Sequence, residues 1–212
     1  MILAAGRGQR MMPLTANTPK PLLRVEGLPL IQHRIHALRD AGIVDLVINV
    51  HYLGEQIKSY LGDGQKYGVS ITYSEEALLL ETAGGILNAL PLLGDAPFLV
   101  VPSDTVMDID FASINKLPSG SQAHLVMVDN PSQHPDGDFS ILENGMLSTQ
   151  GVKLTYSSVA LFSPRFFESL PAGPMPLRNL FRDGIKEAIV TGEYFSGLWA
   201  DIGTPERLAA LN

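Results

Sequence analysis

Apolar and polar positions alternate in blocks along the first half of the chain, and the blocks predict strands and helices in turn. Short, largely apolar runs are typical of buried strands, and they lie at 1–3, 46–50 and 98–101, with a further strand expected at 70–73. Apolar residues recur at helical spacing between these runs, at 30–38 before Gly42, at 57–61 before Gly62 and at 83–90 before Pro91. This order favours an α/β fold with a parallel sheet, in which ligands bind at the carboxyl ends of the strands.

The second half of the chain has a different pattern. A polar stretch rich in turn formers covers 129–138 and follows a strand expected at 125–128. Further strands are expected at 139–142 and 146–149, as a hairpin, and at 156–162, with helices at 164–170 and 177–190. Because no linker or repeat is visible, we expect a single domain over 1–212, with a first half at about 1–128 and a β-rich lobe at about 129–198.

Composition narrows the class of protein. The 212 residues are 45% hydrophobic and 17% charged, and no apolar stretch reaches the ~18 residues of a membrane span, so we expect no membrane partner. The absence of cysteine excludes disulfides, thiolate catalysis and cysteine-bound zinc, and it fits a cytoplasmic location. A net charge of -7 argues against a nucleic-acid partner. A monomer and a small homo-oligomer both remain open.

The charge is distributed unevenly. Residues 1–25 contain Arg7, Arg10, Lys20 and Arg24 and no acidic residue, so the rest of the chain has a net charge of -11. A basic island on an acidic protein suggests a site for a small polyanion. Chance placement of four cations in a surface loop would give the same pattern, so charge alone leaves both interpretations open.

Two motifs lie within the basic segment. Leu3-Ala4-Ala5-Gly6-Arg7-Gly8 consists mostly of small residues, which allow backbone N–H groups to approach an anion closely. It lacks the third glycine of the dinucleotide fingerprint, because position 11 is Met, and it lacks the Gly-Lys-Ser/Thr of a P-loop. In Thr18-Pro19-Lys20-Pro21, two prolines stiffen the backbone around a lysine. Each motif alone is weak evidence for a phosphate site.

Taken together, the motifs resemble the signature of the sugar-1-phosphate nucleotidylyltransferases. Leu-Ala-Ala-Gly-x-Gly-x-Arg-x-x-Pro-Leu-Thr precedes Pro-Lys-Pro, and the likeness continues through 81–85, Asp104 and 199–206. The resemblance implies a Rossmann-like, mostly parallel sheet with helices on both faces, of the nucleotide-diphospho-sugar transferase type, plus a small β-rich sugar lobe. It also implies an enzyme that joins a nucleoside triphosphate to a sugar 1-phosphate and releases pyrophosphate.

Substrates are also suggested by the resemblance. The segments 51–54, 61–64, 80–82 and 128–131 are similar to those of family members that use UTP and N-acetylmuramate 1-phosphate in bacterial peptidoglycan recycling. Mannose 1-phosphate with GTP and glucose 1-phosphate with dTTP or UTP are alternatives. A third interpretation is a catalytically weak relative that binds a nucleotide or a nucleotide sugar.

The resemblance assigns roles to individual residues. Arg10 would hold the phosphates that leave as pyrophosphate, and Lys20 would neutralise the reacting phosphoryl oxygens. Asp104 and Asp201 would hold Mg²⁺, a hard cation that prefers oxygen ligands. Nucleotide contacts are expected at Leu3, Ala4, Ala5, Gly6, Gly8, Glu76, Gly84 and Gly85, and sugar contacts at Asn130, Gly137 and Asp138.

The chain departs from the family's pattern in several places. Ser103 precedes Asp104 where relatives have glycine, and we expect its side chain to crowd the ligand. Ser157-Ser158 replaces a Ser-Gly pair, and Met175-Pro176-Leu177 lacks a common lysine. The chain is short at both ends beside relatives. The first strand lacks its usual opening residues, and the last helix stops at Asn212. We therefore expect that the natural chain starts upstream or that the sequence is trimmed.

Overall fold

The computed structural model describes residues 1–211, so Asn212, where the expected last helix stops, lies outside the described residues. The chain forms two compact units. Unit 1 contains Met1–Leu80, Pro102–Ser113 and the segment from Leu198 onward, and unit 2 contains Glu81–Val101 and Ile114–Gly197. Each unit therefore draws on stretches that lie apart in the sequence.

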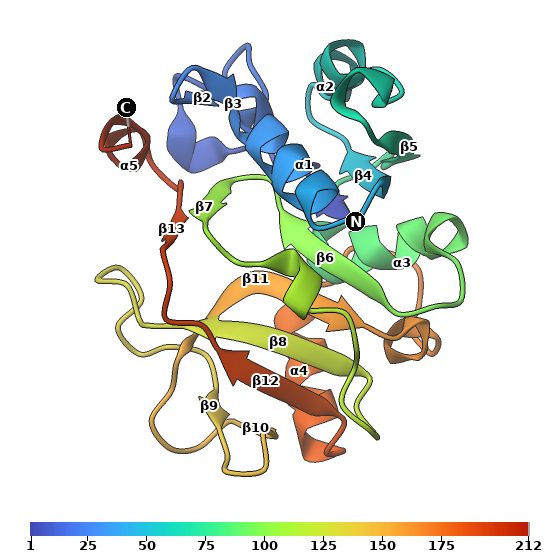
Figure 1. The fold of residues 1–212 in the computed structure, drawn as a ribbon, viewed down its shortest axis with the longest axis vertical. Helices are drawn as coiled ribbons and strands as arrows, with labels where there is room; N and C mark the ends of the chain where they lie inside the picture. Colours follow the sequence, from blue (N-terminus) through green and yellow to red (C-terminus); the bar gives the residue numbers. More distant parts are fainter. Residues whose placement is uncertain (212) are drawn as a thin grey trace. The chain divides into compact units, whose positions relative to one another are not determined.

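The sheet of unit 1 contains parallel strands β1 (Ile2–Leu3), β4 (Asp45–Val50) and β5 (Ser70–Glu75). Helices α1 (Leu30–Asp40) and α2 (Gly54–Leu61) lie between these strands in the chain, as parallel neighbours require (Figure 1). The run 46–50 is buried along its whole length, which is typical of a strand covered on both faces.

Helix α1 shows how the sequence pattern determines packing. Four apolar side chains at helical spacing are buried, as predicted: Leu30, Ile31, Ile35 and Leu38. The helix ends just before Gly42, which has a φ of 81°, a conformation that glycine adopts without strain. There the N–H group of Ile43 donates to the Leu38 carbonyl oxygen and closes the helix end.

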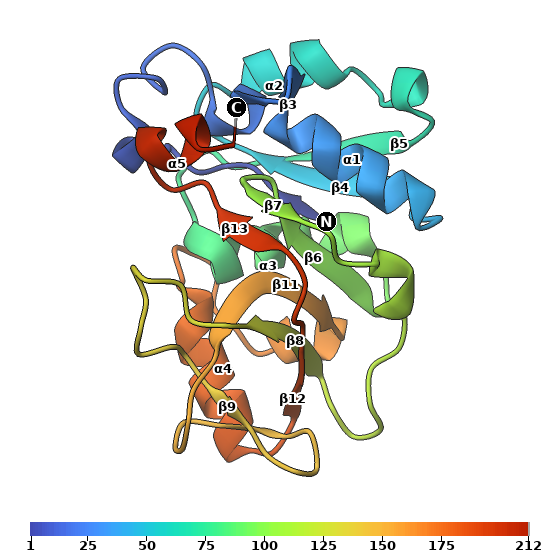
Figure 2. The same cartoon turned by 60° about the vertical axis from the view of Figure 1, so that its left-hand side comes forward.

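The sheet of unit 2 has the strand order β12–β8–β11–β6, with bounds Val190–Tyr194, Ala123–Val128, Thr155–Phe162 and Phe98–Pro102. β12 is parallel to β8, whereas β11 is antiparallel to both of its neighbours. Helices α3 (Glu81–Leu93) and α4 (Leu177–Lys186) belong to the same unit (Figure 2). Its core is aromatic, with the Phe162 ring centroid 5.2 Å from that of Phe167 and 5.6 Å from that of Phe166.

Shorter elements connect the longer ones. The predicted hairpin is present as β9 (Ser140–Ile141) and β10 (Leu147–Ser148). Other antiparallel pairs are β2 (Arg24–Val25) with β3 (Leu28–Pro29), and β7 (Thr105–Met107) with β13 (Trp199–Asp201). Helix α5 spans Pro205–Ala209, and 3₁₀ turns lie at Gln9–Met11, Lys20–Leu22, Gln65–Tyr67, Phe111–Ser113 and Pro164–Phe167.

Several helix predictions differ from the structure. Helix α3 continues past Pro91 to Leu93, and this proline lies in the exposed last turn, where the helix has little left to lose. The helix expected over 177–190 ends at Lys186, and Val190 instead begins β12. Ala188 has a φ of 54° between them, which takes the chain out of the helical path. The helix expected at 164–170 is a short 3₁₀ turn.

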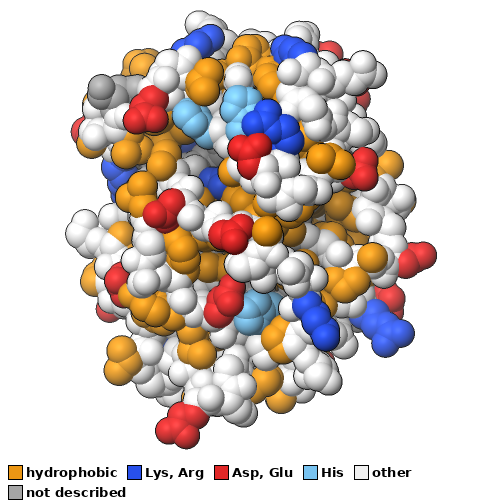
Figure 3. All heavy atoms as spheres, viewed as in Figure 1, with side chains coloured by type: hydrophobic (Ala, Val, Ile, Leu, Met, Phe, Trp, Pro, Cys, Tyr) orange, Lys and Arg blue, Asp and Glu red, His pale blue; other side chains and the backbone are white. Residues whose placement is uncertain are grey.

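The predicted α/β class with a mostly parallel sheet is confirmed. Parallel pairing joins β1, β4 and β5 in unit 1, and β8 and β12 in unit 2. Within residues 1–211, no helix has the length and apolar character needed to cross a membrane. On the face shown in Figure 3, basic and acidic side chains of the described residues are interspersed.

Candidate active site in unit 1

The first motif forms a loop that folds back after β1. Gly8 has a φ of 61°, and a Cβ atom there would lie 3.0 Å from Thr15 Cγ2 and 3.2 Å from Lys20 Cβ. The Thr15 hydroxyl donates a 2.8 Å hydrogen bond to the Gly8 carbonyl oxygen. Around Gly6, by contrast, a Cβ atom would meet nothing within 4 Å. Position 8 therefore requires glycine so that Lys20 can pack closely, and the loop is open at Gly6.

A buried chain of hydrogen bonds fixes the start of this loop. Asn49 Oδ1 accepts a 2.8 Å bond from the Ala4 N–H group, and Asn49 Nδ2 donates a 2.7 Å bond to Glu76 Oε1. The other oxygen of Glu76 accepts a 3.0 Å bond from the Leu80 N–H group. Both oxygens of Glu76 thus hold backbone and side chain in place, and its predicted contact with the base stays a prediction.

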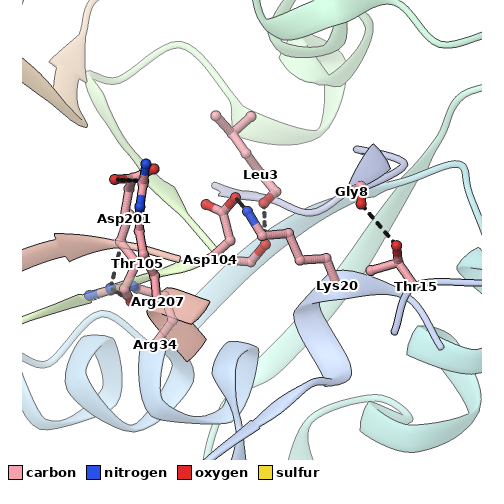
Figure 4. A network of polar contacts seen from close by, with 10 residues as sticks. Leu3, Gly8, Thr15, Lys20, Arg34, Asp104, Thr105, Asp201 and Arg207 are labelled. Carbon is pink, nitrogen blue, oxygen red and sulfur yellow. Dashed lines mark hydrogen bonds and ion pairs between the residues drawn. The ribbon is translucent and has the colours of Figure 1, made fainter. Parts of the chain in front are cut away.

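Lys20 and Asp104 meet just beyond the end of β6. The lysine ammonium and the carboxylate form an ion pair, and Figure 4 shows the two side chains pointing toward one another. Lys20 has 11% of its side chain exposed, whereas Asp104 has 37% exposed. The pair joins the second motif to a predicted metal ligand, and it leaves part of the carboxylate accessible.

Arg34, which no motif includes, holds the backbone on both sides of Ser103 and Asp104. Its guanidinium donates to the carbonyl oxygens of Pro102 at 3.2 Å and Thr105 at 3.0 Å. Burial lowers the pKa of Arg34 to about 10, while the charge of Asp104 acts to raise it. The group therefore stays protonated at neutral pH, and it places a buried positive charge beneath the Asp104 turn.

The Ser103 side chain does not point toward open space. It is buried, and its hydroxyl donates a 2.6 Å hydrogen bond to the Leu3 carbonyl oxygen. The Ser103 N–H group donates to the same oxygen at 3.2 Å. The hydroxyl therefore ties the Asp104 turn to β1, and the effect of Ser103 on a ligand stays a prediction.

Asp201 is brought to Asp104 by the pairing of β13 with β7. Asp201 lies opposite Thr105, and the Ile202 N–H group donates a 3.0 Å bond to the Asp104 carbonyl oxygen. Arg207 Nη1 donates a 2.6 Å hydrogen bond to Asp201 Oδ1 (Figure 4). The two predicted metal ligands thus lie at adjacent positions, and each is paired with a cation.

These two carboxylates are a suitable donor set for Mg²⁺. No group of three or more His, Asp or Glu side chains within residues 1–211 could hold a metal by itself. Mg²⁺, however, is commonly bound by one or two carboxylates while phosphate and water oxygens complete its octahedron. Asp104 and Asp201 therefore fit a cation that arrives with a triphosphate.

The other predicted contacts lie in unit 2. Gly84 and Gly85 are buried in α3, where the Gly84 N–H group donates to the Met175 carbonyl oxygen at 3.4 Å. Asn130 donates from Nδ2 to the carbonyl oxygens of Pro135 at 3.0 Å and Lys153 at 2.9 Å, and its Oδ1 accepts from the Thr155 hydroxyl at 2.9 Å. The polar atoms of the Asn130 side chain are thus engaged within the unit.

Gly137 and Asp138 are likewise held by contacts within unit 2. Gly137 has a φ of 62°, and a Cβ atom there would lie 2.8 Å from Asn130 Oδ1. Asp138 Oδ2 accepts a 3.0 Å bond from the Tyr156 N–H group, and Oδ1 accepts a 2.7 Å bond from Arg178. Burial acts to raise the pKa of Asp138, but these bonds hold it below its usual value. Sugar contacts from these residues stay predictions.

Comparison with known proteins identifies the family of this chain. A family model described as Nucleotidyl transferase matches residues 1–153, which include the loop, Lys20 and Asp104. The chain belongs to the nucleotidyl transferase family. The predicted family membership is therefore confirmed.

Among nucleotidyl transferases, two relatives match nearly the whole chain. N-acetylmuramate alpha-1-phosphate uridylyltransferase of Neisseria meningitidis serogroup B is 48% identical over 98% of this chain and 94% of the relative. The enzyme of the same name from Caulobacter vibrioides is 31% identical over 99% of this chain and 94% of the relative. HddC of Yersinia pseudotuberculosis has a similar fold, with a TM-score of 0.82 at 21% identity over 99% of this chain and 96% of that protein.

Proposed function

We propose that this nucleotidyl transferase moves a uridylyl group from UTP to N-acetylmuramate 1-phosphate, giving a UDP-sugar and pyrophosphate. The observation that carries the proposal is the 48% identity to the N. meningitidis uridylyltransferase over 98% of the chain. The C. vibrioides enzyme of the same name, 31% identical to this chain, supports it as well. We place such an enzyme in peptidoglycan recycling in the cytoplasm.

The reaction is a direct displacement at phosphorus. An oxygen of the sugar phosphate attacks the α-phosphorus of UTP, the bond from that phosphorus to the bridging oxygen breaks, and pyrophosphate leaves with the electron pair. A phosphate monoester is already a nucleophile at neutral pH, so no general base is needed. Catalysis then depends on positioning and on neutralising charge at the phosphoryl oxygens.

Unit 1 contains groups suited to that task. Lys20, largely buried and flanked by prolines, would face the reacting phosphoryl oxygens. Arg10, which is exposed, would hold the leaving phosphates. The backbone of Leu3 to Gly8, open at Gly6, would hold the nucleoside and the α-phosphate. The family resemblance also implies base contacts at Glu76, Gly84 and Gly85 and sugar contacts at Asn130, Gly137 and Asp138, and these stay predictions.

Asp104 and Asp201 would hold Mg²⁺. When bound there, the ion would supply positive charge beside the phosphates. Arg34 holds the carbonyl oxygens of Pro102 and Thr105, and it therefore keeps Asp104 in position. The pairing of β7 with β13 does the same for Asp201.

The test is a pyrophosphate-release assay with Mg²⁺ across all pairs of four nucleoside triphosphates and four sugar phosphates. The sugar phosphates are those of N-acetylmuramate, N-acetylglucosamine, mannose and glucose. We expect turnover to be highest with UTP and N-acetylmuramate 1-phosphate. Higher turnover on another pair would reassign the substrate, and tight nucleotide binding without turnover on any pair would show a binding protein instead.

A further inference from the structure

Arg207 is a partly buried cation beside the candidate metal site to which no motif assigns a role. It lies in α5, where the Thr204 hydroxyl accepts a hydrogen bond from its N–H group. Its guanidinium is bound to Asp201, and both side chains are 28% exposed. Arg207 is thus held in place but keeps a face that a ligand could reach.

A second guanidinium lies against the same spot. The position that a Cβ atom of Gly203 would occupy is 3.1 Å from Arg207 Nη1, 3.3 Å from Arg10 Nη1 and 2.9 Å from Asp201 Oδ2. Glycine at 203 leaves room for the three groups to converge. Because like charges repel, negative charge placed between two neighbouring guanidiniums stabilises their approach.

Arg10 lacks a carboxylate partner at this point. Asp201 pairs with Arg207, and Glu206 lies near enough to Arg207 for their charges to interact, but no carboxylate within residues 1–211 forms an ion pair with Arg10. A divalent cation on Asp201 would also compete with Arg207 for the carboxylate. Arg207 would then need another anion, and two adjacent guanidiniums are well suited to phosphate oxygens.

We propose that Arg207 is a second phosphate-binding residue that acts with Arg10 on the pyrophosphate end of the triphosphate. Asp201 holds Arg207 in place until a divalent cation binds the carboxylate. This inference rests on the proposed function, because it requires a triphosphate at the Arg10 loop. It assigns to the segment 204–209 a direct part in substrate binding.

The main experiment measures binding of inorganic pyrophosphate by calorimetry in the presence of Mg²⁺. Loss of a charge-assisted contact should weaken binding of the Arg207→Gln variant by about tenfold or more. Arg207→Lys, which keeps the charge, should recover part of the affinity. Arg182→Gln is the matched control, because this exposed arginine lies on α4 in unit 2 and should leave binding unchanged.

A second measurement separates a ligand contact from a purely structural ion pair. Without divalent cation, Arg207→Gln should cost little pyrophosphate affinity in the native chain, because Asp201 holds Arg207. In the Asp201→Asn background the same substitution should cost several-fold more, because Arg207 is released to the ligand. Thermal unfolding of every variant confirms that the folded protein is being compared.

Two results would overturn the inference. One is unchanged pyrophosphate affinity in folded Arg207→Gln with Mg²⁺ present. The other is an equal cost of Arg207→Gln in the two metal-free backgrounds. The proposed function fails separately, if the native chain binds pyrophosphate through Arg207 but does not turn over UTP with N-acetylmuramate 1-phosphate.

Discussion

The candidate site of unit 1 and the loop 130–138 of unit 2 are both rich in polar side chains, but the two regions use them differently. In unit 1, charged groups from separate segments pair while staying partly exposed, as Lys20 does with Asp104. In loop 130–138, Asn130 and Asp138 direct their polar atoms to backbone and side-chain groups of the same unit. Partly exposed charges are available to a ligand, whereas satisfied amides and carboxylates stabilise a loop.

The comparison separates two meanings of a motif match. A residue that matches a family pattern can contact the substrate, or it can hold the backbone that does so. Glu76 belongs to the second kind by geometry, since both of its oxygens accept hydrogen bonds from protein groups. The predictions below test this division, beginning with the largest expected effect.

Removal of a charge from the unit 1 site should have the largest effect. Asp104→Ala should lower kcat by about a hundredfold or more, because it removes a predicted Mg²⁺ ligand and the partner of Lys20. Lys20→Ala and Arg10→Ala should each lower kcat by at least about tenfold. The measurement is pyrophosphate release at saturating substrates, with Asp95→Ala in unit 2 as the control. Native turnover in any of these folded variants would reject that residue's assignment.

Replacement of Arg34 should mainly lower the stability of the fold and should affect activity through the position of Asp104. Arg34→Met leaves the carbonyl oxygens of Pro102 and Thr105 without their donor, so the free energy of unfolding should fall by about 2 kcal/mol. Arg34→Lys should lose less, since an ammonium can reach one of the two oxygens. Urea unfolding measures both. Equal stability of Arg34→Met and the native chain would show that the buried guanidinium does not hold the Asp104 turn.

Much of the fold follows from short-range pattern. Residues 30–38 and 46–50 identify α1 and β4 because one face of the helix and both faces of the strand are buried. The start of β12 does not follow, because residues 187–190 are compatible with a helix. Only the long-range pairing of Val190 with Ala123 selects a strand there.

The candidate site is predictable where a residue belongs to a recognisable motif, as Lys20 and Asp104 do, and the structure brings these two together. Arg34 and Asn49 act through tertiary contacts, and their signal in the sequence is indirect. Arg34 is a charge on the apolar face of α1, and Asn49 is a polar residue within a buried strand. Such positions indicate that a buried partner exists, but not which one, because the partners lie 68 residues away for Arg34 and Pro102 and 27 for Asn49 and Glu76.

The side chain of Asn130 should stabilise the loop 130–138 through its hydrogen bonds. Asn130→Ala removes the donor to Lys153 and the acceptor of Thr155, so the free energy of unfolding should fall by about 1–2 kcal/mol. Asn179→Ala on the exposed face of α4 is the control. If stability is unchanged while KM for the sugar phosphate rises, Asn130 contacts the sugar, and the contrast between the two regions is weaker than we infer.

Replacement of Asp138 should have the smallest effect on stability, and the pH dependence of that effect identifies its cause. The carboxylate accepts bonds from the Tyr156 N–H group and from Arg178, which lower its pKa in the folded state. A lowered pKa stabilises the fold above the unfolded-state pKa of about 3.9, and that contribution is lost as the pH falls through the folded-state pKa. Because Arg178 is exposed, its ion pair contributes little, and the bond from Tyr156 dominates.

Asp138→Asn should therefore lower the free energy of unfolding by about 1 kcal/mol at about pH 7. The gap between the native chain and Asp138→Asn should narrow at about pH 3.5, since a protonated carboxyl and an amide both offer one carbonyl oxygen to Tyr156. Asp136→Asn, two residues away and exposed, should show no gap at either pH. A gap for Asp138→Asn that is constant with pH would mean that the charge of Asp138 does not stabilise the loop. Its carboxylate would then be available to the sugar, as the family resemblance implies.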